Sequence, residues 1–350
     1  DWLYALAEKV DCRLMVRLVK GAYWDTEVKR AQTLGLEGFP VFTRKASTDV
    51  SYIASAKKLL SMTDRLYPQF ATHNAHTVAA ILELAEDPKS FEFQRLHGMG
   101  EALHDQVMKT EGTRCRIYAP VGAHRDLLAY LVRRLLENGA NSSFVNQIVD
   151  ESVPPEEVAA DPFETVLAAL PKAEHPRLPL PEAIYGDERR NAKGWDLADP
   201  EHLANIEAAR APFLSETWQT APMIAGPVEG GARHRVRNPA RADDLVGEVI
   251  EASKADIETA LKTARNWRDR PASAIADVLN RAADLYEANH GAFFALAARE
   301  AGKTLLDCVG ELREAVDFLR YYATEAKRLE ARKPHGIIAC ISPWNFPLAI

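Results

Sequence analysis

The sequence predicts an α/β protein with a parallel sheet, followed by a second domain after a proline-rich stretch. Four apolar stretches between residues 12 and 122 have the composition of buried strands, and helical stretches alternate with them. This alternation is typical of a parallel sheet with right-handed crossovers. Eight of the chain's 20 prolines then lie within residues 151–200, where the alternation ends.

The four predicted strands end in glycine or polar residues. They are expected within residues 12–24, 70–76, 91–100 and 116–122, and helices are expected from residue 26, over about 49–61, over 77–86 and over 127–138. Barrels and doubly wound sheets both place their chemistry at the carboxyl ends of parallel strands, so these ends mark the expected site in either architecture. No GxGxxG motif follows any of the four strands, so a Rossmann dinucleotide site is not expected in this half.

Composition excludes several other classes of protein. The chain has 47% hydrophobic and 27% charged residues, a net charge of −7 and only four cysteines, which form no CxxC pair. A disulfide framework and a zinc site are therefore not expected, and no metal ligand is assigned. Nothing in the charge pattern favours a nucleic-acid surface, and no apolar run reaches the ~18 residues of a membrane span.

The segment 127–144, LLAYLVRRLLENGANSSF, combines a leucine-rich surface with two adjacent arginines. Its apolar residues surround most of a helix, so the helix is expected to be largely buried. Arg133 and Arg134 lie one turn before Glu137, but one carboxylate cannot satisfy two guanidinium groups of five donors each. The spacing alone leaves two interpretations open: a solvated basic notch on the helix, or a clamp that binds a second carboxylate.

The second half begins after a proline-rich, acidic linker. The expected domains are residues 1–150, the linker 151–200 as an extended and solvated connector, and residues 201–350. In the last of these, short strands are expected over 223–250, three helical segments follow from residue 254, and HGIIACISPWNFP is expected to be a strand entering a loop. We expect Glu300, Glu311 and Glu314 to be surface or structural charges on these helices, without a functional role.

The motifs of both halves resemble one family. The first half resembles the proline dehydrogenase domain of the bifunctional proline utilization A family in LVKGAYWD, FATHNAHT, FEFQRLHGMGE, RIYAPVG and YLVRRLLENGANSSFVNQI. The second half resembles the opening of that family's aldehyde dehydrogenase domain in RVRNPARADDLVGEVIEAS, REAGKT and ISPWNFPLAI. The resemblance implies the C-terminal half of a (βα)8 TIM-like barrel, a linker, and the N-terminal part of a Rossmann-like aldehyde dehydrogenase domain.

This resemblance also implies a function. Family members oxidise L-proline to 1-pyrroline-5-carboxylate with FAD and then oxidise glutamate semialdehyde to glutamate with NAD, passing electrons from FAD to a quinone or another acceptor. The resemblance further implies a cytoplasmic enzyme, with homo-oligomers and peripheral association with the inner membrane in the full-length protein. The resemblance also implies that the sequence is the middle of a longer polypeptide, so this piece alone is expected to be inactive.

Site residues of the first half follow from the same resemblance. Arg133 and Arg134 are expected to bind the carboxylate of proline, Glu137 to orient them, and Tyr118 to pack against the proline ring. This resemblance favours the clamp interpretation of the helix. FAD contacts are expected from Arg17, Lys20, Gly21, Ala22, Tyr23, Trp24, Thr43, Arg44, Lys45, His73, Asn74, Gln94 and Leu96.

In the second half, the terminal motif carries the expected chemistry. Asn345 is expected to donate a hydrogen bond to the oxyanion that forms when a thiolate attacks an aldehyde. NAD contacts are expected from Ile341, Ser342, Pro343 and Trp344. Two alternatives remain: a monofunctional aldehyde dehydrogenase with an unrelated N-terminal extension, and a DNA-binding autoregulator, which would need a domain upstream of this sequence.

Overall fold

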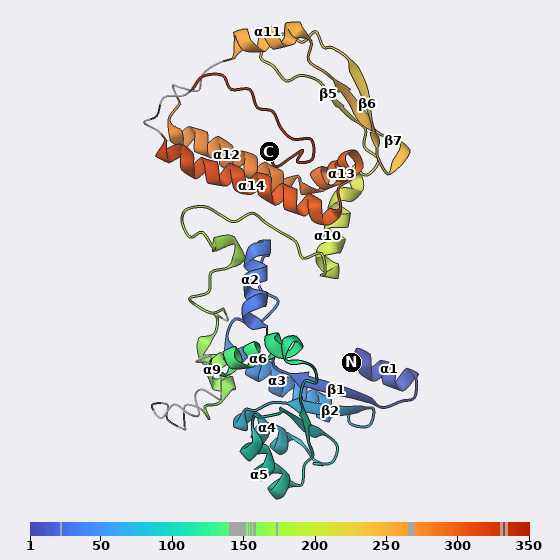
Figure 1. Cartoon of the computed structure of the whole chain (residues 1–350), viewed down its shortest axis with the longest axis vertical. Coiled ribbons are helices and arrows are strands. Elements are labelled where there is room, and N and C mark those ends of the chain that lie inside the picture. Colours follow the sequence, from blue (N-terminus) through green and yellow to red (C-terminus); the bar gives the residue numbers. More distant parts are fainter. Residues whose placement is uncertain are drawn as a thin grey trace. The chain divides into compact units, whose positions relative to one another are not determined.

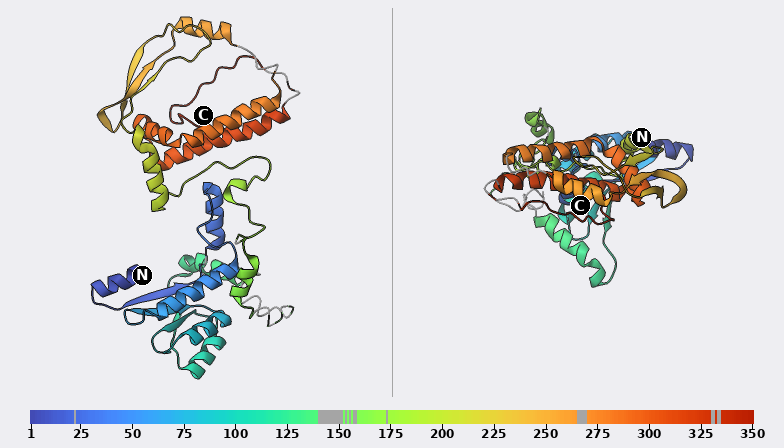
Figure 2. Two further views of the ribbon diagram at one scale, coloured as in Figure 1. Left: turned by 180° about the vertical axis from the view of Figure 1, so that it is seen from behind. Right: turned by 90° about the horizontal axis from the view of Figure 1, so that it is seen from above.

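In the computed structural model the chain forms two compact units (Figures 1 and 2). The first contains residues 1–27 and 40–178, and the second contains residues 28–39 and 179–350. The structure describes all residues except 22, 140–151, 153, 155, 157–158, 173, 265–269, 330–331 and 333–334, and the side chains of 135–139.

A four-stranded parallel sheet forms the centre of the first unit, in the order β1-β2-β3-β4. The strands are β1 (Leu14–Val19), β2 (Leu66–Ala71), β3 (Glu92–Leu96) and β4 (Cys115–Tyr118). The helices are α1 (Trp2–Lys9), α2 (Trp24–Leu34, whose residues from Val28 onwards belong to the second unit), α3 (Lys45–Leu60), α4 (Ala75–Leu84), α5 (Glu101–Glu111), α6 (His124–Gly139) and α9 (Pro162–Ala169). The parallel α/β fold predicted from the sequence is confirmed.

The core of the first unit lies between the sheet and helices α3, α4 and α5. Phe70, Phe91 and Phe93 are fully buried there, with ring centroids 5.5 Å and 5.3 Å apart in successive pairs. Each such ring contributes roughly 1.5–3 kcal/mol by leaving water. Side chains alternate along β1, so Arg17 lies on the face of this strand that is turned away from the core. Its neighbours on that face, Met15 and Val19, are 57% and 48% exposed.

Helix α6 differs from the expectation that it would be largely buried. Leu128 is 62% exposed, Leu131 47% and Val132 45%. An apolar helix surface becomes buried only where other elements cover it, and within the described residues these side chains keep substantial exposure. The face of α6 that carries Arg133 and Arg134 is half-buried.

The second unit combines a small sheet with a pair of long helices, and its sheet has the order β5-β7-β6. The strands are β5 (Trp218–Thr220), β6 (Arg233–Asn238) and β7 (Arg241–Ile250), and the helices are α10 (Pro200–Arg210), α11 (Lys254–Thr263), α12 (Ala272–Ala288), α13 (His290–Ala301) and α14 (Leu305–Arg328), with 3-10 turns η1 (Pro181–Ala183) and η2 (Ala211–Phe213). Helices α12 and α14 lie side by side along their length (Figures 1 and 2). Cys308, Leu312 and Phe294 are fully buried in the core that α13 shares with α14.

The stretch 151–200 is not the uniformly solvated connector that the sequence suggested. Its first part contains α9, and its later part packs into the second unit, where Asn191, Ala192 and Trp195 are buried. The Asn191 amide donates hydrogen bonds to the backbone oxygens of Gln32 (3.1 Å) and Pro181 (2.9 Å). The bond to Pro181 satisfies a carbonyl of the proline-rich backbone, and the bond to Gln32 joins the segment to the end of α2, so the segment can be buried without regular secondary structure.

Residues 28–39 belong to the second unit, which the sequence did not indicate. Gly194 donates a backbone hydrogen bond to the Gly35 carbonyl at 2.8 Å, and a side chain on Gly194 would overlap the Leu34 carbonyl. Gly35 has φ +64°, a conformation that glycine adopts without strain. The unit limits therefore differ from the expected division at 150 and 200 because the end of α2 packs against a segment far along the chain.

The strand expected in HGIIACIS does not form. Residues 335–342 are irregular, and Ile337, Ile338 and Ile341 are 63%, 67% and 96% exposed. A buried strand of a parallel sheet requires neighbours to accept and donate its backbone hydrogen bonds, and this segment pairs with none of the described strands. Its apolar composition indicated a strand, but composition alone does not supply the pairing.

Candidate functional site

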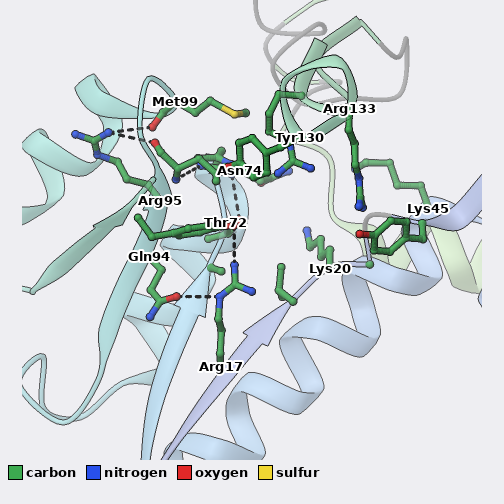
Figure 3. Close-up of a pocket in the computed structure, with 18 of the residues that line it drawn as sticks. Arg17, Lys20, Lys45, Thr72, Asn74, Gln94, Arg95, Met99, Tyr130 and Arg133 are labelled. Carbon is green, nitrogen blue, oxygen red and sulfur yellow. Dashed lines mark hydrogen bonds between the residues drawn. The ribbon is translucent and has the colours of Figure 1, made fainter. Parts of the chain in front are cut away.

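The carboxyl ends of the four parallel strands border a cavity of about 960 Å³ (Figure 3). Six of its lining residues are arginine or lysine: Arg17, Lys20, Lys45, Arg95, Arg133 and Arg134. Tyr23, Tyr118 and Tyr130 contribute aromatic surface, and no aspartate or glutamate is among the described residues that line it. A cavity of this size and charge suits an anionic ligand with flat rings.

Arg17 is held by side chains from two other strands. Its Nε donates to Oε1 of Gln94 at 2.9 Å, and its Nη2 donates to the hydroxyl of Tyr118 at 3.2 Å. The guanidinium carbon also lies 5.1 Å from the centroid of the Tyr118 ring. Side chains of β1, β3 and β4 therefore fix one cation at the edge of the cavity. Figure 3 shows the bond between Arg17 and Gln94.

Lys20 and Lys45 share one carboxylate. Lys20 Nζ lies 2.5 Å from Oδ1 of Asp49 and 3.0 Å from the hydroxyl of Thr77, and Lys45 Nζ lies 3.0 Å from the other oxygen of Asp49. Burial lowers the pKa of Lys20, although the Asp49 charge acts in the opposite direction. Two ammonium groups against one carboxylate leave a net positive charge beside the cavity.

His73 is a neutral side chain with a fixed tautomer. The backbone N–H of Leu96 donates to its Nε2 at 3.1 Å, so the ring carries its proton on Nδ1. Burial lowers the pKa of His73 to about 4, and the nearby His104, Arg95 and Arg134 act in the same direction. The adjacent Asn74 caps α4, since its Oδ1 accepts from the Thr77 N–H at 3.0 Å.

Two arginines of α6 reach the same cavity. Arg133 lies over the Tyr23 ring, with its guanidinium carbon 3.2 Å from the ring centroid, and Arg134 lies 4.9 Å from the centroid of Tyr130. Guanidinium groups stack favourably on aromatic faces and keep their charge at any working pH. Two cations are thus brought to one wall of the cavity, as the clamp interpretation requires.

A second group of expected site residues lies in the terminal loop of the second unit. Asn345 is exposed and Trp344 is 88% exposed. Lys303 Nζ donates to the backbone oxygen of Asn345 at 2.6 Å and lies 3.3 Å from Glu311. Glu311 in turn accepts from the Leu348 N–H at 3.1 Å and is only 4% exposed. Of the two expectations for this residue, a surface charge or a structural one, the structure shows the structural charge.

Comparison with known proteins places both units in one family. Residues 1–147 match the family model of proline dehydrogenase, and residues 228–350 match that of the aldehyde dehydrogenase family. Bifunctional protein PutA of Escherichia coli (strain K12) is 51% identical over 371 residues, and that of Klebsiella aerogenes is 50% identical over 373 residues; both alignments include 100% of this chain. The chain belongs to the bifunctional PutA family. It spans 28% of the length of these two relatives.

Solved PutA structures have the same fold. A crystal structure of bifunctional proline utilization A matches with a TM-score of 0.82 and 45% identity. The match covers 100% of this chain and 35% of the chain in that crystal structure. PutA from Bdellovibrio bacteriovorus, inactivated by N-propargylglycine, has a TM-score of 0.80 and 30% identity, covering 99% of this chain and 38% of that chain. The fold is therefore part of a TIM-barrel-like proline dehydrogenase domain followed by the start of an aldehyde dehydrogenase domain.

The structure brings most of the residues expected from the PutA resemblance into the cavity. They are Arg17, Lys20, Gly21, Tyr23, Lys45, His73, Asn74, Gln94, Leu96, Tyr118, Arg133 and Arg134. Ala22 and the side chain of Glu137 lie outside the described residues. Their roles stay predictions, since position in a cavity does not by itself assign one.

Three other residues expected to contact FAD are not among the described residues that line the cavity. Trp24 donates from its indole nitrogen to the Phe42 carbonyl at 2.8 Å. Arg44 donates to the backbone oxygen of Glu174 at 3.0 Å, and the Thr43 hydroxyl accepts from the His175 N–H at 2.9 Å. These side chains fasten loop segments of the first unit, because backbone groups of irregular segments need polar partners that the sheet does not provide.

Sequence reasoning missed seven lining residues of the cavity: Val19, Ala71, Thr72, Arg95, Met99, Ala129 and Tyr130. Thr72 and Arg95 immediately precede the expected site residues His73 and Leu96. Their positions at the carboxyl ends of strands could therefore have indicated them. Arg95 is buried and donates to the Leu96 carbonyl at 3.3 Å. Tyr130 lies one helical turn before Arg133 and Arg134, a spacing that places it on the same face of α6.

Proposed function

We propose that the first unit oxidises L-proline to 1-pyrroline-5-carboxylate with FAD, and that the second contributes to NAD-dependent oxidation of glutamate semialdehyde to glutamate. The observation that carries the proposal is the cation-lined cavity at the strand ends, within the region that matches proline dehydrogenase. This chain spans 28% of the length of the two PutA relatives. The proposal therefore concerns the extended enzyme, which is this sequence as part of a polypeptide of the relatives' full length.

The residues of the cavity fit a flavin dinucleotide. A pyrophosphate needs cations and hydrogen-bond donors, and Lys20 and Lys45 share only one carboxylate between them. His73 presents a donor from Nδ1 without introducing a charge. Tyr23 and Tyr118 offer aromatic surface to an isoalloxazine ring. When bound, FAD would accept the hydride from C5 of proline and pass the electrons to a quinone or another acceptor.

The chain's own residues would bind and orient the substrate. Arg133 and Arg134 would hold the carboxylate of proline, and Tyr118 would pack against its ring. Arg17, fixed by Gln94 and Tyr118, would place a positive charge beside the flavin and so stabilise the reduced anion. Fixing the substrate in this way removes translational and rotational freedom before the transfer step.

In the second unit, the Asn345 amide would donate to the oxyanion that forms from the semialdehyde. Residues 341–344 would lie along NAD. Lys303 and Glu311 support this proposal, because they hold the backbone of the loop that carries Asn345. A cytoplasmic location, homo-oligomers and peripheral membrane association are further proposals for the extended enzyme.

Flavin absorbance and two assays of the extended enzyme test the function. We expect a yellow protein that reduces a dye with proline and forms NADH with pyrroline-5-carboxylate. NADH formation without flavin or proline oxidation would instead support a monofunctional aldehyde dehydrogenase with an unrelated extension. Sequence-specific DNA binding in a gel-shift assay, with neither activity present, would favour the autoregulator.

A further inference from the structure

A buried carboxylate, Glu92, lies at the centre of a hydrogen-bond network that joins all four strands of the first unit. Glu92 is 4% exposed. It accepts from Arg116 on β4 at 2.6 Å and 2.9 Å, from Gln69 on β2 at 2.6 Å, and from Gln94 on β3 at 3.2 Å. Gln94 then accepts from Arg17 on β1 at 2.9 Å.

The strand register explains why these side chains meet. Arg17 is paired with Gln69, Gln69 with Glu92, and Gln94 with Arg116. Neighbouring strands of a sheet lie about 4.8 Å apart, so polar side chains at these positions come within hydrogen-bonding reach across the sheet. The network is therefore a consequence of the parallel register.

Glu92 is ionised at neutral pH. Burial raises the pKa of this carboxyl, but hydrogen bonds from Arg116, Gln94 and Gln69 outweigh that effect, so its pKa lies below the ordinary value. An ionised carboxylate accepts hydrogen bonds and donates none. Every group that faces it must consequently be a donor.

This requirement fixes the orientation of the Gln94 amide. Because Nε2 of Gln94 donates to Glu92, its Oε1 is directed at Arg17 (Figure 3). The reverse orientation would place the Gln94 oxygen against the carboxylate and its NH2 group against the donors of Arg17, so both contacts would be repulsive. Glu92 lies outside the lining of the cavity, whereas Gln94 and Arg17 belong to that lining.

We propose that Glu92 is a positioning residue of the proline-oxidising site: it orients the Gln94 amide and thereby holds the Arg17 guanidinium at the flavin. This inference rests on the proposed function of the first unit. Glu92 touches neither flavin nor substrate in this scheme and acts only through Gln94 and Arg17.

The test combines Glu92→Gln with Arg17→Met in the extended enzyme as a double-mutant cycle. Flavin content, the KM for proline and the rate of flavin reduction at saturating proline are measured for each variant. We expect Glu92→Gln to slow flavin reduction about tenfold, the order expected when one charge-assisted hydrogen bond is misdirected, with flavin content and KM nearly unchanged. In the Arg17→Met background, the same change should alter the rate by less than about twofold.

Two further variants complete the design. Glu92→Asp keeps the charge and should retain more of the rate than Glu92→Gln, and Glu83→Gln, an exposed carboxylate on α4, should leave it unchanged. A normal rate in Glu92→Gln, or an equal loss with and without Arg17, overturns the positioning role alone. Loss of flavin from both Glu92 variants also overturns it, because the role would then be structural. A wild-type enzyme that does not oxidise proline overturns both this inference and the proposed function.

Discussion

The cavity at the strand ends and the terminal loop of the second unit both carry expected site residues, but they hold them in different ways. In the cavity, Gln94 and Leu96 are 6% and 7% exposed, and Arg17 is fixed by two side chains. In the loop, Trp344 is 88% exposed, and Lys303 and Glu311 hold the backbone instead of the functional side chains.

This difference shows two sources of preorganisation. A parallel sheet sets the spacing of residues on neighbouring strands, so the network of Arg17, Gln94 and Glu92 forms within one unit. An irregular loop has no such spacing and depends on anchors elsewhere in the chain; Lys303 lies 42 residues before Asn345. The functional side chains of the loop must gain their order from a bound ligand or from further contacts.

The largest effect is expected for Arg134→Met in the extended enzyme, which tests whether the cavity binds the carboxylate of proline through Arg134. Losing a charged hydrogen bond to a buried carboxylate should cost about 2–5 kcal/mol in kcat/KM for proline, with most of the change in KM and with flavin content retained. Arg125→Met is the matched control, since Arg125 lies on the same helix with a 93% exposed side chain. Unchanged proline kinetics in a flavin-replete variant would rule out the clamp.

Asn345→Ala tests whether the two regions are functionally separate. Removal of an oxyanion donor typically lowers the rate about 10²–10³-fold, so NADH formation from pyrroline-5-carboxylate should fall by this factor. Proline-to-dye electron transfer should stay within about twofold of wild type, because the two sites lie in different units. A parallel fall of both activities would show that the division between the units, or the assignment of Asn345, is wrong.

Lys303→Met tests whether the loop depends on its anchor. The change removes the hydrogen bond to the Asn345 backbone and leaves Glu311 without one cation, so semialdehyde oxidation should fall about tenfold. Lys303→Arg, which keeps a charged donor, should recover part of the rate. Lys327→Met, at an exposed position of α14, provides the control, and equal losses in both methionine variants would contradict the anchor.

His73→Gln should change the free energy of unfolding least at neutral pH and clearly in acid. The folded-state pKa of His73 is about 4, below the ordinary 6.5, so the unfolded chain binds more protons between these values and stability falls as the pH decreases through this window. Replacement by glutamine, which can accept from the Leu96 N–H, should remove about 2–3 kcal/mol of that fall. The measurement is the urea midpoint of flavin release at pH 7 and pH 4.5, and equal pH dependence in both proteins would refute the assignment.

The cavity could be predicted from the sequence to a large extent. Polar residues such as His73 and Gln94 follow apolar strand segments, and parallel strands bring their carboxyl ends together. The hydrogen bonds of Trp24 and Arg44 could not be predicted in this way, because their partners are backbone carbonyls of loops with no periodic signal. The partner of Glu311 could not be predicted for a similar reason: helical spacing does not reveal that the backbone of a distant loop donates to its carboxylate.

The contact between the end of α2 and the segment around Asn191 has a consequence for synthesis on the ribosome. Gln32 and Asn191 are 159 residues apart in the chain. At roughly 5–20 residues per second, Asn191 is made about 8–30 s after Gln32. During that interval residues 28–39, with the buried Val28, Ala31 and Leu36, have none of their partners from the later part of the second unit. The nascent chain must therefore expose these apolar side chains to water during that time. Transiently exposed apolar surface of this kind is what chaperones bind.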